Sequence, residues 1–218
     1  MAPSTDFKYP PPLVKGTLRS LAWLISKAFW FIRYRGLENI PSPDLGPFII
    51  ASNHQTYIDP AWICTPLPVR HNLRFMAWGD AFNWRYVGRL IQYLGAFPVS
   101  LEVSGALKAM KEALKALRSG AVLVVFPEGE REFGDGEMLP FKEGVVRLAT
   151  QAKVPILPVT ISGGNFIWPR GKTYPRVFRR VTITYHSLIT ITRDEVEDGH
   201  TLLDELNAKL RDTIASTL

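Results

Sequence analysis

The sequence predicts an α/β fold, with a mixed, partly parallel sheet flanked by helices, and three observations support this prediction. Continuous apolar runs of strand length occupy residues 48–51, 121–126 and 154–161, as expected of strands buried on both faces. Helical patterns at 104–119 and 142–152 alternate with these runs. A chain of 218 residues, 46% hydrophobic and 21% charged, is long and apolar enough to bury a core.

The N-terminal part divides into a tail and a helix. Residues 1–12 contain four prolines and are expected to form a disordered tail. Residues 13–34 have the pattern of an amphipathic helix, whose polar side centres on Arg19. Trp23 and Trp30 fall near that polar side, where a membrane interface would accommodate their rings. We therefore expect a membrane-interfacial helix, with packing on the protein's own core as the alternative.

Polar residues follow the first apolar run directly. His54 lies where this strand ends, and Asp59 followed by Pro60 is typical of a helix N-cap and first helical position. On one continuous helix His54 and Asp59 would point roughly 140° apart, whereas across a strand–turn–helix corner they can meet. A carboxylate that accepts from one imidazole nitrogen leaves the other free to take a proton near neutral pH. The alternative is that Asp59 only caps the helix and His54 is an ordinary turn residue.

Two helices are predicted in the middle of the chain. Residues 74–94 are dense in aromatic residues and predict a core helix, with the wall of an apolar site as the alternative. Residues 95–99 predict a short strand or turn. The helix at 104–119 has Ser104 as a candidate N-cap and Gly120 just beyond its end. Its apolar stripe consists of Leu107, Met110, Leu114 and Leu117.

The strand at 121–126 runs into the charged turn 128–132. Charged groups at the carboxyl end of a buried strand mark the edge where open α/β sheets keep their sites. The strand at 154–161 contains two prolines, so we expect it at an edge, at a bulge or at a strand's first residues. A basic and aromatic loop at 163–180, an alternating strand at 181–185 and an amphipathic helix from about residue 201 complete the chain.

The net charge of +6 is unevenly distributed. Residues 15–35 and 163–180 hold ten of the 26 basic residues and no acidic one, which leaves the rest of the chain at −4. Such clustering indicates an anionic partner, and membrane phosphates, nucleic acid and a phosphorylated substrate all fit. Lys27 interrupts the N-terminal apolar stretch, which is too short to span a membrane. Cys64 is the only cysteine, so we expect a reducing compartment and a buried hydrophobic role for this residue.

Four motifs follow one another in a fixed order. They are Asn53-His54-x4-Asp59, Gly-Ala-Phe-Pro-Val at 95–99, Phe-Pro-Glu-Gly-Glu-Arg at 126–131 and Val-Pro-Ile-Leu-Pro at 154–158. Over roughly residues 35–185 the chain resembles the glycerolipid acyltransferases, the family of lysophosphatidic acid acyltransferases and their relatives. The resemblance implies an acyltransferase domain over 35–218. It also implies transfer of an acyl chain from acyl-CoA or acyl carrier protein to a lyso-lipid hydroxyl at a membrane surface, with no further cofactor and no metal.

The resemblance also implies roles for particular residues. His54 would be the general base and Asp59 its orienting partner, which agrees with the need to remove an alcohol's proton as it attacks. Backbone N–H groups near the His54 turn are expected to stabilise the oxyanion. The expected substrate-binding residues are Glu128, Gly129, Arg131, Gly95, Phe97 and Pro155. Arg131 offers a planar fork for a phosphate.

The chain departs from the family pattern next to these residues. Ser100 and Leu101 stand where the family commonly has Asp-Arg, and Glu130 and Glu132 flank Arg131. The acceptor therefore stays open between 1-acyl-glycerol-3-phosphate and another lyso-lipid, such as an amino-acid lipid or a glycolipid. In the 163–180 loop, Arg170 or Lys172 could supply the positive charge that the family's arginine would provide at position 101.

Two alternative hypotheses assign no catalytic activity to the chain. One is a membrane protein of the same fold, and the other is a nucleic-acid-binding module that uses the two basic and aromatic segments. Both leave the His54 and 126–131 motifs without a role, so we expect no nucleic acid as partner. No Gly-x-Ser-x-Gly elbow, phosphate loop or zinc-ligand spacing occurs in the sequence. We expect an enzyme that binds anionic lipid, peripherally or monotopically, at the cytoplasmic face of a membrane through residues 13–34 and 163–180.

Overall fold

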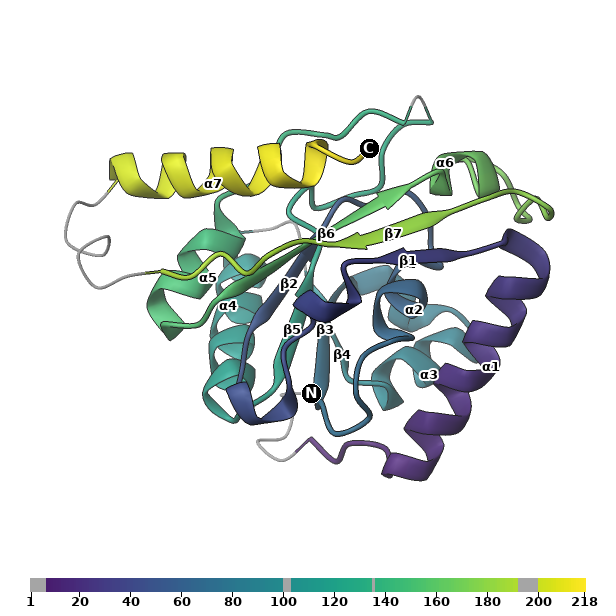
Figure 1. The fold of residues 1–218 in the computed structure, drawn as a ribbon. Helices are drawn as coiled ribbons and strands as arrows, with labels where there is room; N and C mark the ends of the chain where they lie inside the picture. Colours follow the sequence, from purple (N-terminus) through teal and green to yellow (C-terminus); the bar gives the residue numbers. More distant parts are fainter. Residues whose placement is uncertain (1–6, 100–102, 135, 192–199) are drawn as a thin grey trace.

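In the computed structural model, which describes residues 7–99, 103–134, 136–191 and 200–218, a seven-stranded sheet runs through the molecule (Figure 1). The strands are β1 (Arg33–Arg35), β2 (Ile49–Ser52), β3 (Leu73–Trp78), β4 (Ala96–Val99), β5 (Val122–Val125), β6 (Ile156–Ser162) and β7 (Thr182–Tyr185). Their order is β1-β7-β6-β2-β5-β3-β4. β6, β2, β5, β3 and β4 are parallel, whereas β7 is antiparallel to β6 and parallel to β1. The predicted mixed, partly parallel sheet is confirmed.

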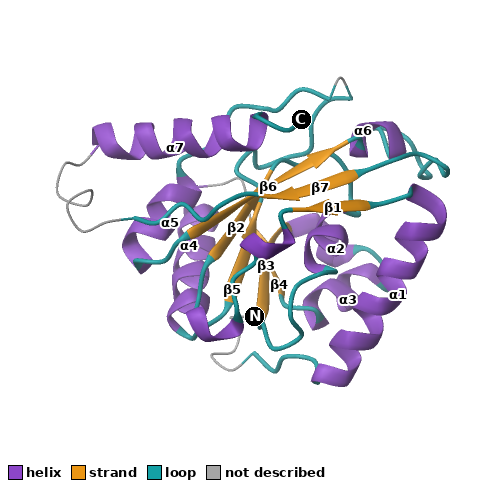
Figure 2. Ribbon diagram, in the orientation of Figure 1, coloured by secondary structure: helices purple, strands orange, loops and turns teal. Residues whose placement is uncertain are grey.

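Helices cover both faces of the sheet, as Figure 2 shows. They are α1 (Pro12–Trp30), α2 (Asp59–Cys64), α3 (Val87–Tyr93), α4 (Val103–Arg118), α5 (Gly144–Ala152), α6 (Gly164–Ile167) and α7 (His200–Ala215). One hydrophobic core lies between the sheet, α1 and α2, and the other lies between the sheet and α4, α5 and α7. Neighbouring residues of β2, Ile49 and Ile50, enter different cores because side chains alternate along a strand.

The parallel strands determine where polar groups can gather. Ala51 of β2 lies opposite both Val125 of β5 and Pro158 of β6. The carboxyl ends of these three strands therefore meet at one edge of the sheet, and the turns that follow them are neighbours.

The predicted helix at 74–94 is wrong over most of its length. Residues 73–78 form β3 between β5 and β4, and the short 3-10 helix η3 (Gly79–Asn83) follows before α3 begins. Tyr86 lies between η3 and α3 and has a φ of +65°, which is outside the helical range. Pairing with strands distant in sequence decides the structure of this segment, and the aromatic pattern contained no sign of that pairing.

The predicted stripe of α4 is correct in part, since Leu117 is buried and Met110 and Leu114 pack against the core. The helix buries Ala109, Ala113, Ala116 and Leu117, while Leu107 is 60% exposed. Three of these four side chains are small, so the helix can approach the sheet closely. Gly120 lies beyond the helix end at a φ of +86°, as predicted for a residue at this position.

Strand β6 is an internal strand despite Pro158. It pairs with β2 on one side and β7 on the other. The ladder with β7 begins at Val159. Before it, the carbonyl of Pro158 accepts the N–H of His186 at 3.0 Å, and an isolated bridge joins Ile156 to Ile189. Pro158 therefore occupies a gap in the ladder, where a missing N–H costs little. Of the three positions expected for the prolines, a strand's first residues is confirmed, since Pro155 precedes β6 and Pro158 is its third residue, whereas an edge position is wrong because β6 lies inside the sheet.

Helix α1 turns its polar side inward. Lys15 donates to the carbonyl of His71, Arg19 donates to the carbonyl of Leu67, and Trp62 donates to Ser26 at 3.1 Å. Trp30 is only 8% exposed and donates from Nε1 to the carbonyl of Arg176 at 2.8 Å. The prediction that Trp30 lies at a membrane interface is therefore wrong, since its ring packs on the protein's own core.

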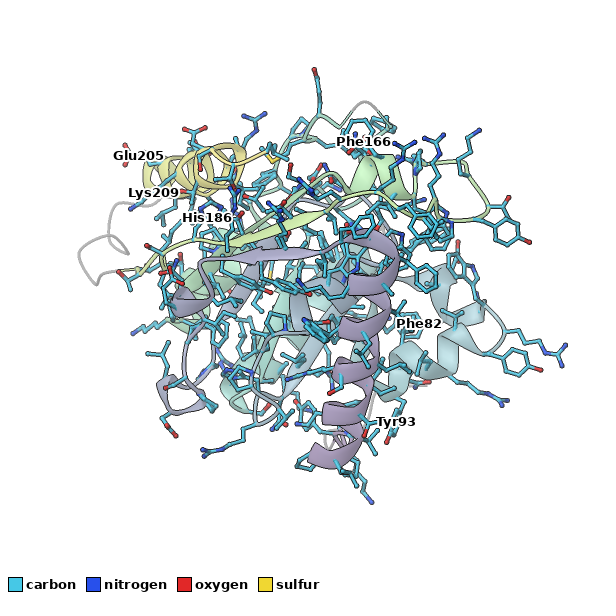
Figure 3. All side chains as sticks on the ribbon, turned by 45° about the vertical axis from the view of Figure 1, so that its right-hand side comes forward. Phe82, Tyr93, Phe166, His186, Glu205 and Lys209 are labelled. Atoms are coloured by element: carbon cyan, nitrogen blue, oxygen red, sulfur yellow. The ribbon has the colours of Figure 1, made fainter. Side chains whose placement is uncertain are left out.

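The opposite side of α1 is apolar and lies on the surface. Its residues exposed by at least about two fifths are Leu13, Leu21, Leu24, Ile25 and Phe29. Trp23, nearer the polar side, is 44% exposed as well. Figure 3, turned so that α1 comes forward, shows this helix along the outer surface of the molecule. None of the helices among the described residues is long and apolar enough to cross a membrane.

The predicted boundaries of the N-terminal segments need correction. Helix α1 ends at Trp30 and not at residue 34, because residues 33–35 pair with β7 as β1. Residues 1–6 of the predicted tail lie outside the described residues. Phe7 lies under the guanidinium of Arg74 at 4.5 Å and Pro10 is buried, so the prediction of disorder is wrong for residues 7–11.

Candidate functional site

His54 and Asp59 meet at the corner between β2 and α2. His54 follows the end of β2, and Asp59 is the first residue of α2. Nδ1 of His54 lies 2.9 Å from Oδ2 of Asp59, and the two side chains are 18% and 0% exposed. When Nδ1 donates to the carboxylate, the neutral ring carries its lone pair on Nε2. Nε2 has no hydrogen-bond partner among the described residues. The predicted pairing of the two residues is therefore present.

The carboxylate of Asp59 organises the turn before it. Oδ2 accepts the backbone N–H groups of Gln55 and Thr56, each at 2.7 Å, and Oδ1 accepts the hydroxyl of Thr56 at 2.7 Å. Asp59 therefore does not cap α2, whose N-cap position is Ile58, and the predicted N-cap role is wrong. The carboxylate instead fixes the turn and the histidine ring together.

The turn after β5 supports His54 from the other side. The ring of Phe126 stacks on the imidazole at a centroid distance of 3.9 Å and an angle of 18°. Glu128 accepts the backbone N–H of His54 and that of Leu139, each at 2.7 Å. In return the N–H of Glu132 donates to the carbonyl of His54 at 3.0 Å. The two turns thus form one hydrogen-bonded unit.

Glu128 is a buried carboxyl group, 3% exposed. Burial raises its pKa to about 7, against the lowering effect of the two backbone donors, and the charges of Asp59 and Glu132 raise it further. Both oxygens are engaged by the protein, so the group supports the position of His54. Its predicted contact with the acceptor stays a prediction.

Three backbone donors near His54 are already in use. The N–H of His54 donates to Glu128, and those of Gln55 and Thr56 donate to Asp59. The N–H of Tyr57 in the same turn has no hydrogen-bond partner among the described residues, and the expectation that backbone donors near His54 stabilise the oxyanion stays a prediction.

Arg131 lies beside this unit with its guanidinium 3.6 Å from the ring centroid of Tyr57. Glu130 forms an ion pair with Arg170, whose Nη2 lies 2.9 Å from Oε2 of Glu130. Glu132 is 2% exposed, and its Oε2 accepts the N–H groups of the glycines at 134 and 136. Within the described parts of the chain, neither flanking carboxylate pairs with Arg131.

The other predicted substrate-binding residues lie at different distances from His54. Gly129 is in the same turn, at a φ of +79°, and a Cβ there would meet Nζ of Lys142 at 2.5 Å. Gly95 precedes β4, Phe97 is buried in the core under α4, and Pro155 precedes β6. Gly95 and Pro155 thus lie at the sheet edge opposite His54, and the binding role of these three residues stays a prediction of the sequence alone. Ser100 and Leu101 lie outside the described residues.

Sequence reasoning missed several residues of the site. Tyr57 and Thr56 lie inside the His54 motif, and Phe126 opens the charged-turn motif. Asn53 is 1% exposed and joins β2 to β6, accepting the N–H of Ile161 at 2.7 Å and donating to its carbonyl at 2.8 Å. The one available signal was position, since each residue directly follows a buried strand or lies between His54 and Asp59.

The composition of the site limits its chemistry. No group of three or more His, Cys, Asp or Glu side chains suited to a metal ion occurs in the described part of the chain. Burial raises the pKa of the Cys64 thiol to about 12, which disfavours the thiolate needed of a nucleophile. The arrangement offers one imidazole base held by a carboxylate, next to a guanidinium. It suits proton removal from a hydroxyl of an anionic substrate.

Comparison with known proteins adds a family and several relatives. The model of a family described as Acyltransferase matches residues 31–162. The chain is 31% identical over 144 residues to 1-acyl-sn-glycerol-3-phosphate acyltransferase BAT2 of Brassica napus. The matched residues make up 66% of this chain and 40% of the relative. It is 30% identical over 138 residues to the Bacillus subtilis 1-acyl-sn-glycerol-3-phosphate acyltransferase, covering 62% of this chain and 66% of that one.

A solved structure matches more of the chain. The crystal structure of the 1-acyl-sn-glycerophosphate acyltransferase PlsC from Thermotoga maritima is similar with a TM-score of 0.72 and 25% identity, over 93% of this chain and 76% of that chain. Against the plant and algal relatives, the chain spans about half of their length, between 40% and 54%.

Proposed function

The chain belongs to the acyltransferase family, and on that premise we propose that it transfers a fatty acyl chain from acyl-CoA or acyl carrier protein to the hydroxyl of 1-acyl-glycerol-3-phosphate or a related lyso-lipid. The observation that carries the proposal is the 2.9 Å contact between His54 and a fully buried Asp59, at the same sheet edge as Arg131. The function assigned to the relatives by name supports the same reaction.

The proposed mechanism needs one base and no covalent acyl-enzyme. Nε2 of His54 takes the proton of the acceptor hydroxyl while its oxygen attacks the thioester carbonyl. The carbon–sulfur bond then breaks, and the thiol leaves with the proton that the imidazole returns. Asp59 holds the tautomer and stabilises the imidazolium that forms in between. Phe126 covers one face of the ring and limits its rotation.

Arg131 is the group we assign to the phosphate of the acceptor. A planar guanidinium binds phosphate oxygens through two parallel N–H donors, and it does so best when no carboxylate competes. Arg170 pairs with Glu130, and Oε2 of Glu132 is held by backbone donors, so neither carboxylate that flanks Arg131 in the sequence pairs with it in the described part of the chain. This arrangement favours a phosphate-bearing acceptor over an amino-acid lipid or a glycolipid.

We further propose that the outward side of α1 binds the membrane surface. Single exposed apolar residues are normal, but a continuous apolar side on one helix is typical of an interaction surface. Loop 163–180 is tied to the end of this helix, since the N–H of Phe178 donates to the carbonyl of Phe29 at 2.6 Å. Its basic residues would attract anionic lipid, as predicted from their clustering. The single cysteine supports a position at the cytoplasmic face.

The test is release of free thiol from a long-chain acyl-CoA, or from an acylated carrier protein, in the presence of a panel of lyso-lipids. We expect release that depends on 1-acyl-glycerol-3-phosphate, with weaker turnover of acceptors that lack a phosphate monoester. Equal or better turnover of an amino-acid lyso-lipid or a lyso-glycolipid would contradict the assigned acceptor. Absence of acceptor-dependent release with either donor would contradict the function.

A further inference from the structure

Tyr57 is the one aromatic residue in the turn that links His54 to Asp59. The guanidinium carbon of Arg131 lies over its ring, 3.6 Å from the centroid. Trp84, which follows η3, and Trp168, which follows α6, contact the Tyr57 ring edge-on at centroid distances of 5.5 Å and 5.4 Å. Three segments that are distant in sequence therefore form one aromatic cluster, defined by Tyr57, Trp84 and Trp168. The guanidinium of Arg131 lies on the Tyr57 ring of this cluster.

The cluster has its own anchors. The indole N–H of Trp168 donates to the carbonyl of Lys172 at 2.7 Å, which fixes its ring. Nη1 of Arg170 donates to the carbonyl of Arg131 at 2.9 Å, which fixes the backbone of the arginine. The side chain of Arg131 has no ion pair or hydrogen bond with any described residue, so the face of Tyr57 is the contact that orients it.

A guanidinium that lies over an aromatic face keeps its N–H donors available. The attraction acts through the face of the cation, whereas the N–H groups point outward in its plane. Stacking therefore immobilises the group without using the donors that a phosphate needs. A carboxylate partner would orient the arginine equally well, but it would compete with the phosphate for the same donors.

We propose that Tyr57 is a positioning residue that holds Arg131 in place for the phosphate monoester of the acceptor. This inference rests on the proposed function. His54 and Tyr57 belong to one turn, which Asp59 fixes through two backbone N–H groups. The same turn thus positions both the base for the hydroxyl and the cation for the phosphate.

The experiment compares kcat and KM for 1-acyl-glycerol-3-phosphate between the wild-type chain, Tyr57→Leu and Tyr57→Phe. We expect Tyr57→Leu to raise KM by about three- to tenfold with little change in kcat, as a lost cation–π contact on a partly exposed ring would. Tyr57→Phe keeps the ring face and should retain the wild-type KM. Tyr86→Leu removes another tyrosine that lies under an arginine, Arg85 at 4.9 Å, and serves as a matched control with unchanged KM.

A double-mutant cycle separates positioning from folding. In an Arg131→Ala background, Tyr57→Leu should have little further effect on KM, because the group through which it acts is gone. Tyr57→Met, which replaces the ring by a longer and more flexible apolar side chain, covers the case in which the leucine variant fails to fold. An unchanged KM in folded Tyr57→Leu or Tyr57→Met, or an equal rise in the Arg131→Ala background, would overturn the inference and leave the acyltransferase proposal standing. Absence of acceptor-dependent thiol release by the wild type would overturn the function itself, and the inference with it.

Discussion

The backbone N–H of His54 donates to the buried carboxyl group of Glu128 at 2.7 Å. This bond joins the turn after β2 to the turn after β5, two segments that lie 74 residues apart in sequence. The side chain that is proposed to do chemistry is therefore held through its ring by Asp59 and through its backbone by Glu128.

Glu128 makes folding stability depend on pH in a predictable direction. Burial raises its pKa from 4.5 to about 7 in the folded state, so between these values the unfolded chain loses the proton first. Stability from this group is complete below about pH 4.5 and is lost as the pH rises towards 7, by an amount on the order of 3 kcal/mol. Glu128→Gln removes the titration. Denaturant unfolding of both proteins between pH 5 and 8 should show the wild type losing stability relative to the variant, and parallel profiles would contradict the burial argument.

Thr56 is expected to act on the reaction through Asp59. Its hydroxyl donates to Oδ1 of Asp59 at 2.7 Å, so Thr56→Val leaves one oxygen of a buried carboxylate without a partner at nearly constant shape. A lost hydrogen bond to a charged group corresponds to about tenfold or more in kcat/KM. Thr56→Ser keeps the hydroxyl and should stay close to wild type. If the valine and serine variants are equally active, the carboxylate does not need this donor.

Asn53 is expected to contribute strongly to stability although it lies in a turn, because its side chain is buried. Replacement by leucine leaves both the N–H and the carbonyl of Ile161 unpaired inside the protein, where each costs about 1–3 kcal/mol. Denaturant unfolding should show a loss on the order of 3 kcal/mol. A loss well under 1 kcal/mol would mean that water replaces the amide at this edge.

Membrane binding through α1 can be tested with two leucines of equal exposure. Leu24 on α1 is 56% exposed and Leu107 on α4 is 60% exposed. Leu24→Ser should lower binding to anionic vesicles by about three- to tenfold, because a side chain at the apolar boundary of the bilayer is lost. Leu107→Ser should leave co-sedimentation unchanged. Equal effects of the two substitutions would contradict a specific role of α1.

The sequence identified the His54 corner because both of its ends carry local signals. A short apolar run ends at Ser52, and Asp-Pro marks the start of a helix, so the side chains could be placed without knowing any partner strand. The support from Phe126 and Glu128 needed the pairing of β2 with β5, which no local pattern reveals. The burial of Glu128 could not be predicted for the same reason.

Helix α1 illustrates a different limit. Its two sides were predictable from periodicity, but the side that faces the protein was not. The polar side packs inward because Lys15 and Arg19 reach backbone carbonyls at residues 71 and 67, and these acceptors are positioned only by the tertiary fold. The helix predicted at 74–94 was wrong for a similar reason, since the strand that forms there depends on pairing with neighbouring strands on both sides.

His54 is proposed as the base of an acyl transfer, and Asp59 as the residue that orients it. The most direct measurement is acceptor-dependent thiol release with 1-acyl-glycerol-3-phosphate by the wild type, His54→Ala and Asp59→Asn, each first shown to unfold cooperatively. We expect the alanine variant to lose about 10²- to 10⁴-fold in kcat, the contribution typical of a general base. Asp59→Asn should also be severely impaired. Wild-type rates in a folded His54→Ala variant would contradict the mechanism.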